Sequence, residues 1–401
     1  MKNLNNLLSF LDRSPTSFHA AKNLIQQSGA TLFEGKVESK KLYYLEKEGS
    51  VFFFRSPLKI PKKAVICAAH TDSPALKLKP QPEVVRDNLF LLASDIYGCP
   101  LLTSWLNRDL VIAGKIAFEN KGKIEERLVH LEDHPLTIPQ LAPHLDHGVN
   151  EMGPILNKQD HLNALAGYFN PKLEGRLLQT LLNVKNLISH DLFLVPKEKA
   201  SLIGYENSFI ASYRLDNLSS CYAILEALKK SSPHTLAIAI FWDHEEIGSE
   251  THSGALSPFF LDSLERIAIA HDLDRLAFLD LKNNSKTYSI DLAHAKNPNY
   301  PEKMDPLHAP LLGLGPVVKW SASQRYATSC TSSSSLPSLQ RFIIRSNLKG
   351  GSTIGPLHAT LTGIPTTDLG IPQLSMHSIR EIIATKDYQA LLALLKKLYE
   401  D

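Results

Sequence analysis

The sequence predicts an α/β protein whose chain is interrupted by an inserted β-rich segment. The apolar runs Val51–Phe54 and Ala64–Ala68 are short and bounded by glycine and proline, which is typical of buried strands. Further on, a helical pattern at Leu218–Leu228 and an apolar run at Thr235–Trp242 indicate alternating helices and strands. Between about Pro80 and Ser212, proline and glycine are frequent and long amphipathic patterns are scarce, so this stretch is expected to be the β-rich insert.

The two ends of the chain predict helices. Apolar residues recur at helical spacing from Phe18 to Ile25 behind the interruption Ser14–Thr16, so two packed helices are expected at the N-terminus. Thr385 is expected to cap a last helix with an apolar face from Tyr388 to Leu398. Residues 256–270 predict mixed helix and loop, and the polar residues 328–338 a loop or a helix start.

Composition narrows the class of protein. The chain has 401 residues, of which 43% are hydrophobic and 21% charged, so it can bury a large core and form about two or three domains. The formal net charge is +2, with 43 basic and 41 acidic side chains interspersed, which argues against a nucleic-acid partner.

The apolar segments and the cysteines of the sequence predict where the protein is located and whether its thiols are reduced. The first 20 residues lack a positive region followed by an apolar stretch, and no later run approaches about 18 apolar residues, so we expect a soluble cytoplasmic protein without a membrane partner. The four cysteines have no paired spacing and are expected to be reduced packing residues.

The first chemically informative motif is His70-Thr71-Asp72, which follows the apolar run at Ala64. Ligands of α/β proteins lie at the carboxyl ends of strands, and alternate residues of an extended chain face the same way. His70 could therefore bind a metal while Asp72 holds its other ring nitrogen. Alone, however, this motif is more typical of a satisfied polar cluster.

A second motif, Asp243-His244-Glu245-Glu246, also follows an apolar run. Four ionisable residues beside a core strand are costly to bury unless cations or donors compensate, and a divalent metal would do so. Glu245 and Glu246 point in different directions, so one carboxylate could bind metal while the other accepts a proton from water. The alternative is a solvated turn.

Three further positions complete the set of candidates. Asp216 precedes a helix, where it is either an N-cap or a carboxylate that bridges two metals. Asp291 follows another strand-like run, and His377 follows a stretch rich in glycine and proline. Histidines and carboxylates on separate strand-end loops suit a pair of borderline metal ions better than a thiolate zinc site.

These motifs together identify a family resemblance. Nearly the whole chain resembles the M18 aminopeptidases, the aspartyl aminopeptidase family of co-catalytic zinc exopeptidases. The resembling segments are Phe10–His19, His70–Pro74, Arg214–Asn217, Asp243–Ser249, Asp291–Ala295, Asn299–Pro301, Gly315–Lys319, Gly351–Pro356 and Met376–Glu381.

The resemblance implies a fold and a metal centre. Residues 1–82 and 214–401 would form a zinc-exopeptidase catalytic domain, a mixed central sheet flanked by helices, and residues 83–213 an inserted β-rich oligomerisation domain. Asp216 would bridge two zinc ions. His70, with Glu246 or Asp291, and His377 would complete the two sites. Glu245 would be the general base and acid, and Asp72 the residue that orients His70.

The resemblance also implies a substrate and an assembly. Peptides would lose one N-terminal residue, and Lys319 would meet an acidic side chain on that residue. His144 would reach the active site of a neighbouring subunit, within the tetrahedral dodecamers that family members build from dimers. A cis peptide bond would join Asp216 to Asn217.

The residues alone leave two alternatives and some questions open. A metal-free binding protein could keep the fold, but it would have no reason to retain the candidate ligands together with Glu245. A deacylase could use the same metals, and a requirement for a free α-amino group would separate it from an aminopeptidase. Lys319 could be an exposed surface lysine. The preference for acidic over neutral residues, and for zinc over manganese or cobalt, is not fixed by sequence.

Overall fold

The computed structural model describes residues 2–232 and 234–400, which divide into two compact units. Unit 1 contains the chain up to Ser73, Ala200–Met376 and the chain from Glu381, and unit 2 contains Pro74–Lys199 and His377–Arg380. Unit 2 thus begins and ends earlier than the range 83–213 suggested by sequence. The strand that opens it follows Ser73 almost at once, while Phe209–Ser212 pairs with the unit 1 strand Glu381–Ala384.

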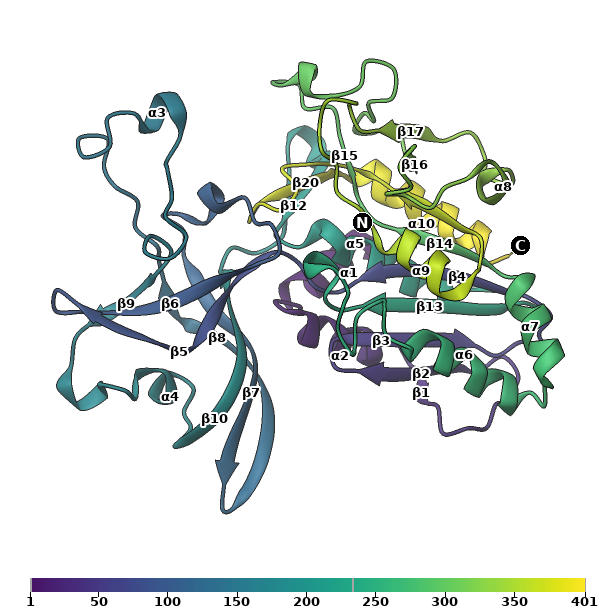
Figure 1. Ribbon diagram of the computed structural model, residues 1–401, viewed down its shortest axis with the longest axis horizontal. Helices are drawn as coiled ribbons and strands as arrows, with labels where there is room; N and C mark the ends of the chain where they lie inside the picture. Colours follow the sequence, from purple (N-terminus) through teal and green to yellow (C-terminus); the bar gives the residue numbers. More distant parts are fainter. Residues whose placement is uncertain (1, 233, 401) are drawn as a thin grey trace. The chain divides into compact units, whose positions relative to one another are not determined.

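Unit 1 is built on a large mixed sheet (Figure 1). In the described residues its strands lie in the order β1 (Thr31–Leu32), β2 (Leu42–Lys47), β3 (Ser50–Arg55), β13 (Leu236–Trp242), β4 (Ala64–His70), β14 (Lys286–Ile290), β18 (Thr366–Gly370), β16 (Val317–Trp320) and β17 (Gln340–Ile343). Strands β13, β4, β14 and β18 are mutually parallel, so their carboxyl ends share one edge.

Helices cover both faces of this sheet. On one face lie α1 (Lys2–Asp12), α2 (Ser17–Ser28), α5 (Leu215–Leu228) and α10 (Thr385–Leu398), and on the other α6 (Phe259–Ala270), α7 (Arg275–Asn283) and α9 (Ile354–Thr362). Phe53 and Cys67 pack against the first set, and their neighbours Phe54 and Ile66 against the second. Because successive side chains of a strand alternate in direction, a strand apolar throughout is buried on both faces.

The remaining elements of unit 1 are short. A smaller sheet has the order β11 (Ser201–Ile203), β12 (Phe209–Ser212), β20 (Glu381–Ala384), β19 (Pro372–Leu374) and β15 (Ala293–His294). The helix α8 (Cys330–Ser333) begins with a capping box between Ser329 and Ser332, so residues 328–338 do contain a helix start.

Unit 2 is a six-stranded antiparallel sheet in the part of the chain that is described. Its order is β8 (Lys123–Leu136), β7 (Leu110–Asn120), β10 (Asn186–Pro196), β5 (Ala75–Arg86), β6 (Leu89–Tyr97) and β9 (Ala164–Tyr168), with the short helices α3 (Val149–Met152) and α4 (Leu177–Leu181). The α/β fold class with a β-rich insert is confirmed.

Two local expectations are wrong. Thr385 is the first residue of α10 and does not cap it; its hydroxyl donates to the Ser208 carbonyl at 3.0 Å. All four cysteines are free, but only Cys67 and Cys221 are buried, whereas Cys99 and Cys330 are exposed and are not packing residues. The local sequence pattern could not predict either feature, because solvent exposure and cap geometry depend on tertiary contacts.

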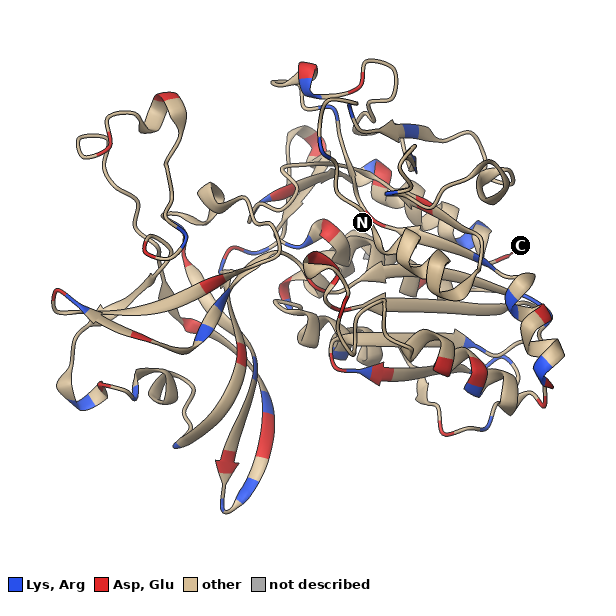
Figure 2. Cartoon of the chain, viewed as in Figure 1, with Lys and Arg blue, Asp and Glu red and all other residues tan. Residues whose placement is uncertain are grey.

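The charged side chains are spread over both units. Figure 2 shows lysine and arginine mixed with aspartate and glutamate along the ribbon of each unit. Among the described residues, no helix is both long and apolar enough to cross a lipid bilayer.

A buried histidine in the core makes the fold sensitive to acid. His358 of α9 is 1% exposed, its ring packs edge-on against Phe260 with centroids 4.6 Å apart, and its Nε2 lies 3.0 Å from Thr287 Oγ1. Burial lowers the pKa of His358 from 6.5 to about 4. The unfolded chain therefore binds a proton at this residue that the folded chain does not bind between those pH values, and stability falls as the pH falls through that window.

We predict that replacing His358 by glutamine removes part of this acid sensitivity. Metal-free wild-type protein should lose about 2 kcal/mol through His358 between pH 7.5 and pH 5, and His358→Gln should lack that contribution. Urea unfolding at both pH values measures it. The exposed His252 gives the matched control His252→Gln, which should behave as wild type. Equal acid sensitivity in His358→Gln and wild type would contradict the prediction.

Candidate metal centre

The candidate residues of unit 1 meet at the shared carboxyl edge of its central strands. β4 lies between β13 and β14 and pairs with both in parallel, with His70 opposite Trp242. His70 ends β4, Asp243 directly follows β13, and Asp291 directly follows β14. Three motifs that are distant in sequence are thus carried to one edge by strand order alone, as expected for an α/β sheet.

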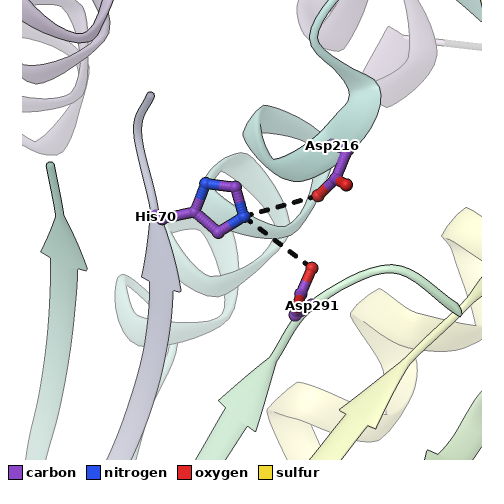
Figure 3. A group of neighbouring side chains, drawn as sticks. All are labelled: His70, Asp216 and Asp291. Atoms are coloured by element: carbon purple, nitrogen blue, oxygen red, sulfur yellow. Dashed lines mark ion pairs between the residues drawn. The ribbon is translucent and has the colours of Figure 1, made fainter. Parts of the chain in front are cut away.

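Three buried residues form the centre of this cluster. The Nε2 atom of His70 lies 3.4 Å from Oδ1 of Asp216 and 3.7 Å from Oδ1 of Asp291. Figure 3 shows both carboxylates converging on that ring nitrogen from separate elements. Ligand atoms of the three residues all lie within 4.8 Å of one another, a separation that one metal ion could span.

Asp72 contacts His70 and also supports a neighbouring loop. Its carbonyl oxygen lies 3.1 Å, and its Oδ1 3.5 Å, from Nδ1 of His70. Its carboxylate also accepts hydrogen bonds from the backbone N–H groups of Glu245 and Glu246, both at 3.1 Å. Sequence reasoning foresaw only a contact with the histidine. The loop contacts arise because the ends of β4 and β13 are adjacent.

Glu245 and Glu246 lie on a single 3-10 turn, Glu245–Ile247, and not on an open solvated turn. Their carboxylates are desolvated although each residue is partly exposed as a whole. This desolvation, strengthened by nearby carboxylates, raises the pKa of Glu245 to about 8 and that of Glu246 well above its ordinary value. A carboxyl with a pKa near neutrality can exchange a proton at physiological pH.

Asp216 is held by its backbone and is not the helix N-cap. The peptide bond from Asp216 to Asn217 is cis, as expected, and both residues have non-helical backbone angles, so regular helix begins at Leu218. The Asp216 N–H donates to Oε2 of Glu381 at 3.0 Å, and its carbonyl accepts from the Ser73 hydroxyl at 2.7 Å. These contacts leave the Asp216 side chain directed at His70.

Sequence reasoning missed three residues that support this centre. Glu381 and Ser73 hold the Asp216 backbone, and the Asn217 side chain donates to the Ile290 carbonyl at 2.7 Å, next to Asp291. All three fall inside the motifs Met376–Glu381, His70–Pro74 and Arg214–Asn217. The motifs could have indicated their importance, but not their partners.

Lys319 is a buried partner of Asp291 and not an exposed lysine. Its side chain is 3% exposed, and Nζ lies 3.3 Å from Oδ2 of Asp291. Burial alone would raise the pKa of Asp291, but the charge of Lys319 and the contacts with His70 outweigh it and lower that pKa. Asp291 is therefore ionised under conditions in which Glu245 can still carry a proton.

The remaining two candidates lie in unit 2. His377 has a positive φ of 66°, and its Nδ1 lies 2.9 Å from the Cys99 carbonyl oxygen. His144 lies in an exposed turn that precedes α3. The contact of His377 with Cys99 and the turn that carries His144 both belong to unit 2.

The residues gathered in unit 1 fit a divalent metal. Two glutamates with raised pKa values lie beside two aspartates, and His70 and Lys319 are the cationic or potentially cationic groups paired with those aspartates. A divalent ion would offset the repulsion among the carboxylates. Imidazole nitrogen together with carboxylate oxygen is a donor set that zinc accepts.

Comparisons with known proteins agree with this chemistry. The family model described as aminopeptidase I zinc metalloprotease (M18) matches residues 10–399. The probable M18 family aminopeptidase 2 of Clostridium novyi is 36% identical over 428 residues, which cover 100% of this chain and 99% of the relative. The protein of the same name from Borreliella burgdorferi is 37% identical over 410 residues, covering 98% and 96%.

Solved structures show the same similarity. A chain in the cryo-EM structure of the Ape4 and Nbr1 complex matches with a TM-score of 0.91 at 31% identity, covering 99% of this chain and 85% of that one. The crystal structure of prApe1 gives 0.90 at 27%, covering 99% and 93%. The S. cerevisiae mApe1 dodecamer, at 24% identity, shares the fold with a TM-score of 0.79, covering 98% and 97%. The chain therefore belongs to the M18 family of zinc aminopeptidases, and it is a peptide hydrolase.

Proposed function

We propose that this aminopeptidase uses two zinc ions and Glu245 as general base to remove acidic N-terminal residues, aspartate or glutamate, from peptides. The observation that carries the proposal is the position of Glu245. Its carboxylate has a pKa of about 8. One ligand atom from each of Glu245, Glu246 and His70 lies within 4.8 Å of the other two. This position beside candidate metal ligands supports a role for Glu245 as the proton acceptor.

We divide the candidate ligands between the two proposed zinc ions according to which residues lie close together. We assign His70, Asp216 and Asp291 to one ion, because these three form a compact group. We assign Glu246 and His377 to the second ion, with Asp216 as the bridge between the two ions that the family resemblance implies. Nδ1 of His377 faces the Cys99 carbonyl, so a protonated Nδ1 would leave Nε2 as the nitrogen that binds metal.

The chemistry requires a proton to move twice. Bound zinc would lower the pKa of water and polarise the scissile carbonyl. Glu245 would accept the proton of the attacking water and then give it to the nitrogen of the leaving amine. Asp72 supports both roles, because its carboxylate holds the Glu245 backbone while it contacts Nδ1 of His70.

Lys319 is the proposed determinant of the preference for acidic residues. A lysine ammonium carries three N–H donors, and the pair with Asp291 occupies one direction around Nζ. A second carboxylate, from the substrate's first residue, would find a buried positive charge beside the metal ligands. Charge-assisted contacts of this kind are stronger where water is excluded.

We extend the family's assembly to this chain. The S. cerevisiae relative is a dodecamer, and we propose that this protein is a homo-oligomer built from dimers, with unit 2 as its oligomerisation domain. The exposed turn with His144 would contribute to a neighbouring subunit's active site. We place the enzyme in the cytoplasm, where its four free cysteines would stay reduced.

The role of Glu245 predicts a large and selective loss of activity. Glu245→Gln should lower kcat for peptide hydrolysis by about 10²–10⁴-fold, because glutamine cannot accept the proton. Its zinc content, measured by mass spectrometry, should remain that of wild type. The exposed neighbour Glu250 provides the control Glu250→Gln, which should keep full activity. A fully active Glu245→Gln enzyme would exclude Glu245 as the base.

The role of Lys319 predicts a change in specificity. Lys319→Met should lower kcat/KM for an aspartyl reporter relative to a leucyl reporter by about 10–100-fold, the loss of one contact to a charged group. Because Lys319 also pairs with Asp291, both rates should fall, and their ratio is the informative quantity. Exposed Lys349 supplies the control Lys349→Met. An unchanged ratio would mean that Lys319 only supports Asp291. N-acetylated reporters should stay intact with every variant, because an aminopeptidase requires a free α-amino group.

The role of His144 across subunits predicts complementation. His144→Ala and Glu245→Gln should each impair the homo-oligomer. Co-expressed, they should regain partial activity, because an intact Glu245 in one subunit can combine with His144 of the next. Activity of purified mixed oligomers, compared with a mixture of separately assembled ones, measures this. No gain on co-expression would mean that His144 acts within its own subunit or has no role in catalysis.

A further inference from the structure

We propose that Ser17 and Asp243 are positioning residues that fix the loop carrying Glu245 and Glu246, an inference that rests on the proposed function of these two glutamates. Neither residue belongs to the candidate metal ligands. Ser17 comes from the N-terminal motif Phe10–His19, for which the proposed function provides no role. Asp243 begins the loop that follows β13.

The loop needs external support because its backbone is unusual. His244 and Ser249 have positive φ values of 67° and 64°, in a region that non-glycine residues rarely adopt. Such conformations persist only where the surrounding structure holds them. Glu245 and Glu246 lie between these two positions, so their side-chain directions depend on that support.

Asp243 supplies the support from the start of the loop. It is 1% exposed, its Oδ1 accepts a hydrogen bond from the N–H of His244 at 2.9 Å, and its own N–H donates to Ser50 Oγ at 2.7 Å. The Ser50 hydroxyl in turn donates to the Ser253 carbonyl at 2.7 Å, beyond the end of the loop. The start of the loop and the segment just beyond its end are therefore both tied to β3 through Ser50.

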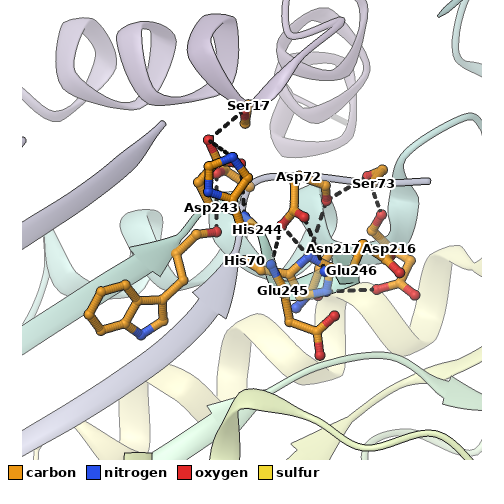
Figure 4. A network of polar contacts seen from close by, with 12 residues as sticks. Ser17, His70, Asp72, Ser73, Asp216, Asn217, Asp243, His244, Glu245 and Glu246 are labelled. Atoms are coloured by element: carbon orange, nitrogen blue, oxygen red, sulfur yellow. Dashed lines mark hydrogen bonds and ion pairs between the residues drawn. The ribbon is translucent and has the colours of Figure 1, made fainter. Parts of the chain in front are cut away.

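Ser17 fixes the other carboxylate oxygen of Asp243. Its hydroxyl, at the start of α2, donates to Oδ2 at 3.0 Å, and Figure 4 shows it on the side of Asp243 away from the metal ligands. A buried carboxylate that loses a donor pays a large desolvation penalty, so removing this hydroxyl should make Asp243 move or rotate. That motion would pass directly to the N–H of His244.

The contact between Ser17 and Asp243 is closely packed against Gly49. A Cβ atom on Gly49 would lie 2.1 Å from Oδ2 of Asp243 and 2.9 Å from Oγ of Ser17. The Gly49 carbonyl also accepts from the Thr71 hydroxyl at 2.8 Å, and the Thr71 N–H donates to the Trp242 carbonyl at 2.7 Å. One turn thus joins the N-terminal helix, the loop with the glutamates and the segment with His70.

The test compares two buried serines that each lose a hydroxyl donor. Ser17→Ala removes the donor to Asp243, and Ser263→Ala removes a hydroxyl that donates to the Phe259 carbonyl at 2.6 Å on α6, away from the metal ligands. Ser17→Thr restores a hydroxyl, and Asp243→Asn removes the carboxylate itself. Each variant is measured for kcat, KM, zinc affinity against a chelator, and amide exchange of the peptide that contains Glu245 and Glu246.

We expect Ser17→Ala and Asp243→Asn to lower kcat by about 10–100-fold with little change in KM, because a small displacement of a reacting group has that effect. Zinc affinity should weaken by about 10–100-fold, and the loop amides should exchange faster. Ser17→Thr should recover much of each loss. Ser263→Ala should match wild type in kcat, KM, zinc affinity and amide exchange. Exchange and zinc affinity test the loop even if no substrate is found.

Two results would overturn different proposals. If Ser17→Ala and Asp243→Asn match Ser263→Ala in kcat, zinc affinity and loop exchange, the positioning role fails while the aminopeptidase mechanism stands. If wild-type protein binds zinc yet Glu245→Gln hydrolyses peptides as fast as wild type, the proposed function of Glu245 fails, and loop exchange in Ser17→Ala still decides whether Ser17 holds the loop.

Discussion

The repulsion among carboxylates at one edge of the unit 1 sheet is the constraint on which the rest of the site depends. The cluster has two kinds of member. Asp291 has a lowered pKa because Lys319 and His70 outweigh its burial, whereas at Glu245 burial and the neighbouring carboxylates outweigh the charge of His70 and raise the pKa to about 8. A single environment therefore shifts the pKa values of an aspartate and a glutamate in opposite directions, a pattern that suits two carboxylates with different roles.

Further carboxylates in the same region position the backbone. Asp72 accepts from the N–H groups of Glu245 and Glu246, Glu381 accepts from the N–H of Asp216, and Asp243 accepts from the N–H of His244. Backbone donors satisfy these carboxylates and also hold loops whose conformations would otherwise be unfavourable. The carboxylates of the site thus divide between those that converge on His70 and those that accept hydrogen bonds from the backbone.

The sequence predicted the fold class and the identity of the unit 1 cluster because both depend on local pattern. Apolar runs predicted β4 and β13, and ionisable residues directly after such runs predicted which side chains reach the sheet edge. The partners of Asp72 and Glu381 could not be predicted in this way, since they depend on which strands are adjacent and on backbone direction in irregular loops. The burial of Lys319 beside Asp291 has the same cause, because the sheet order places β14 and β16 on either side of β18.

Two of the points at which the chain crosses between the units, at Ser73 and at Glu381, lie next to contacts with Asp216. Ser73, the last residue before unit 2, donates to the Asp216 carbonyl, and Glu381, the first residue after His377–Arg380, accepts from the Asp216 N–H. The β-rich segment Pro74–Lys199 separates His70 from Asp216 in the sequence, and the hydrogen bond from Ser73 ties its first junction to Asp216. Within unit 1 the side chains of His70 and Asp216 lie 3.4 Å apart. Residues far apart in the sequence are in this way brought within reach of one metal ion.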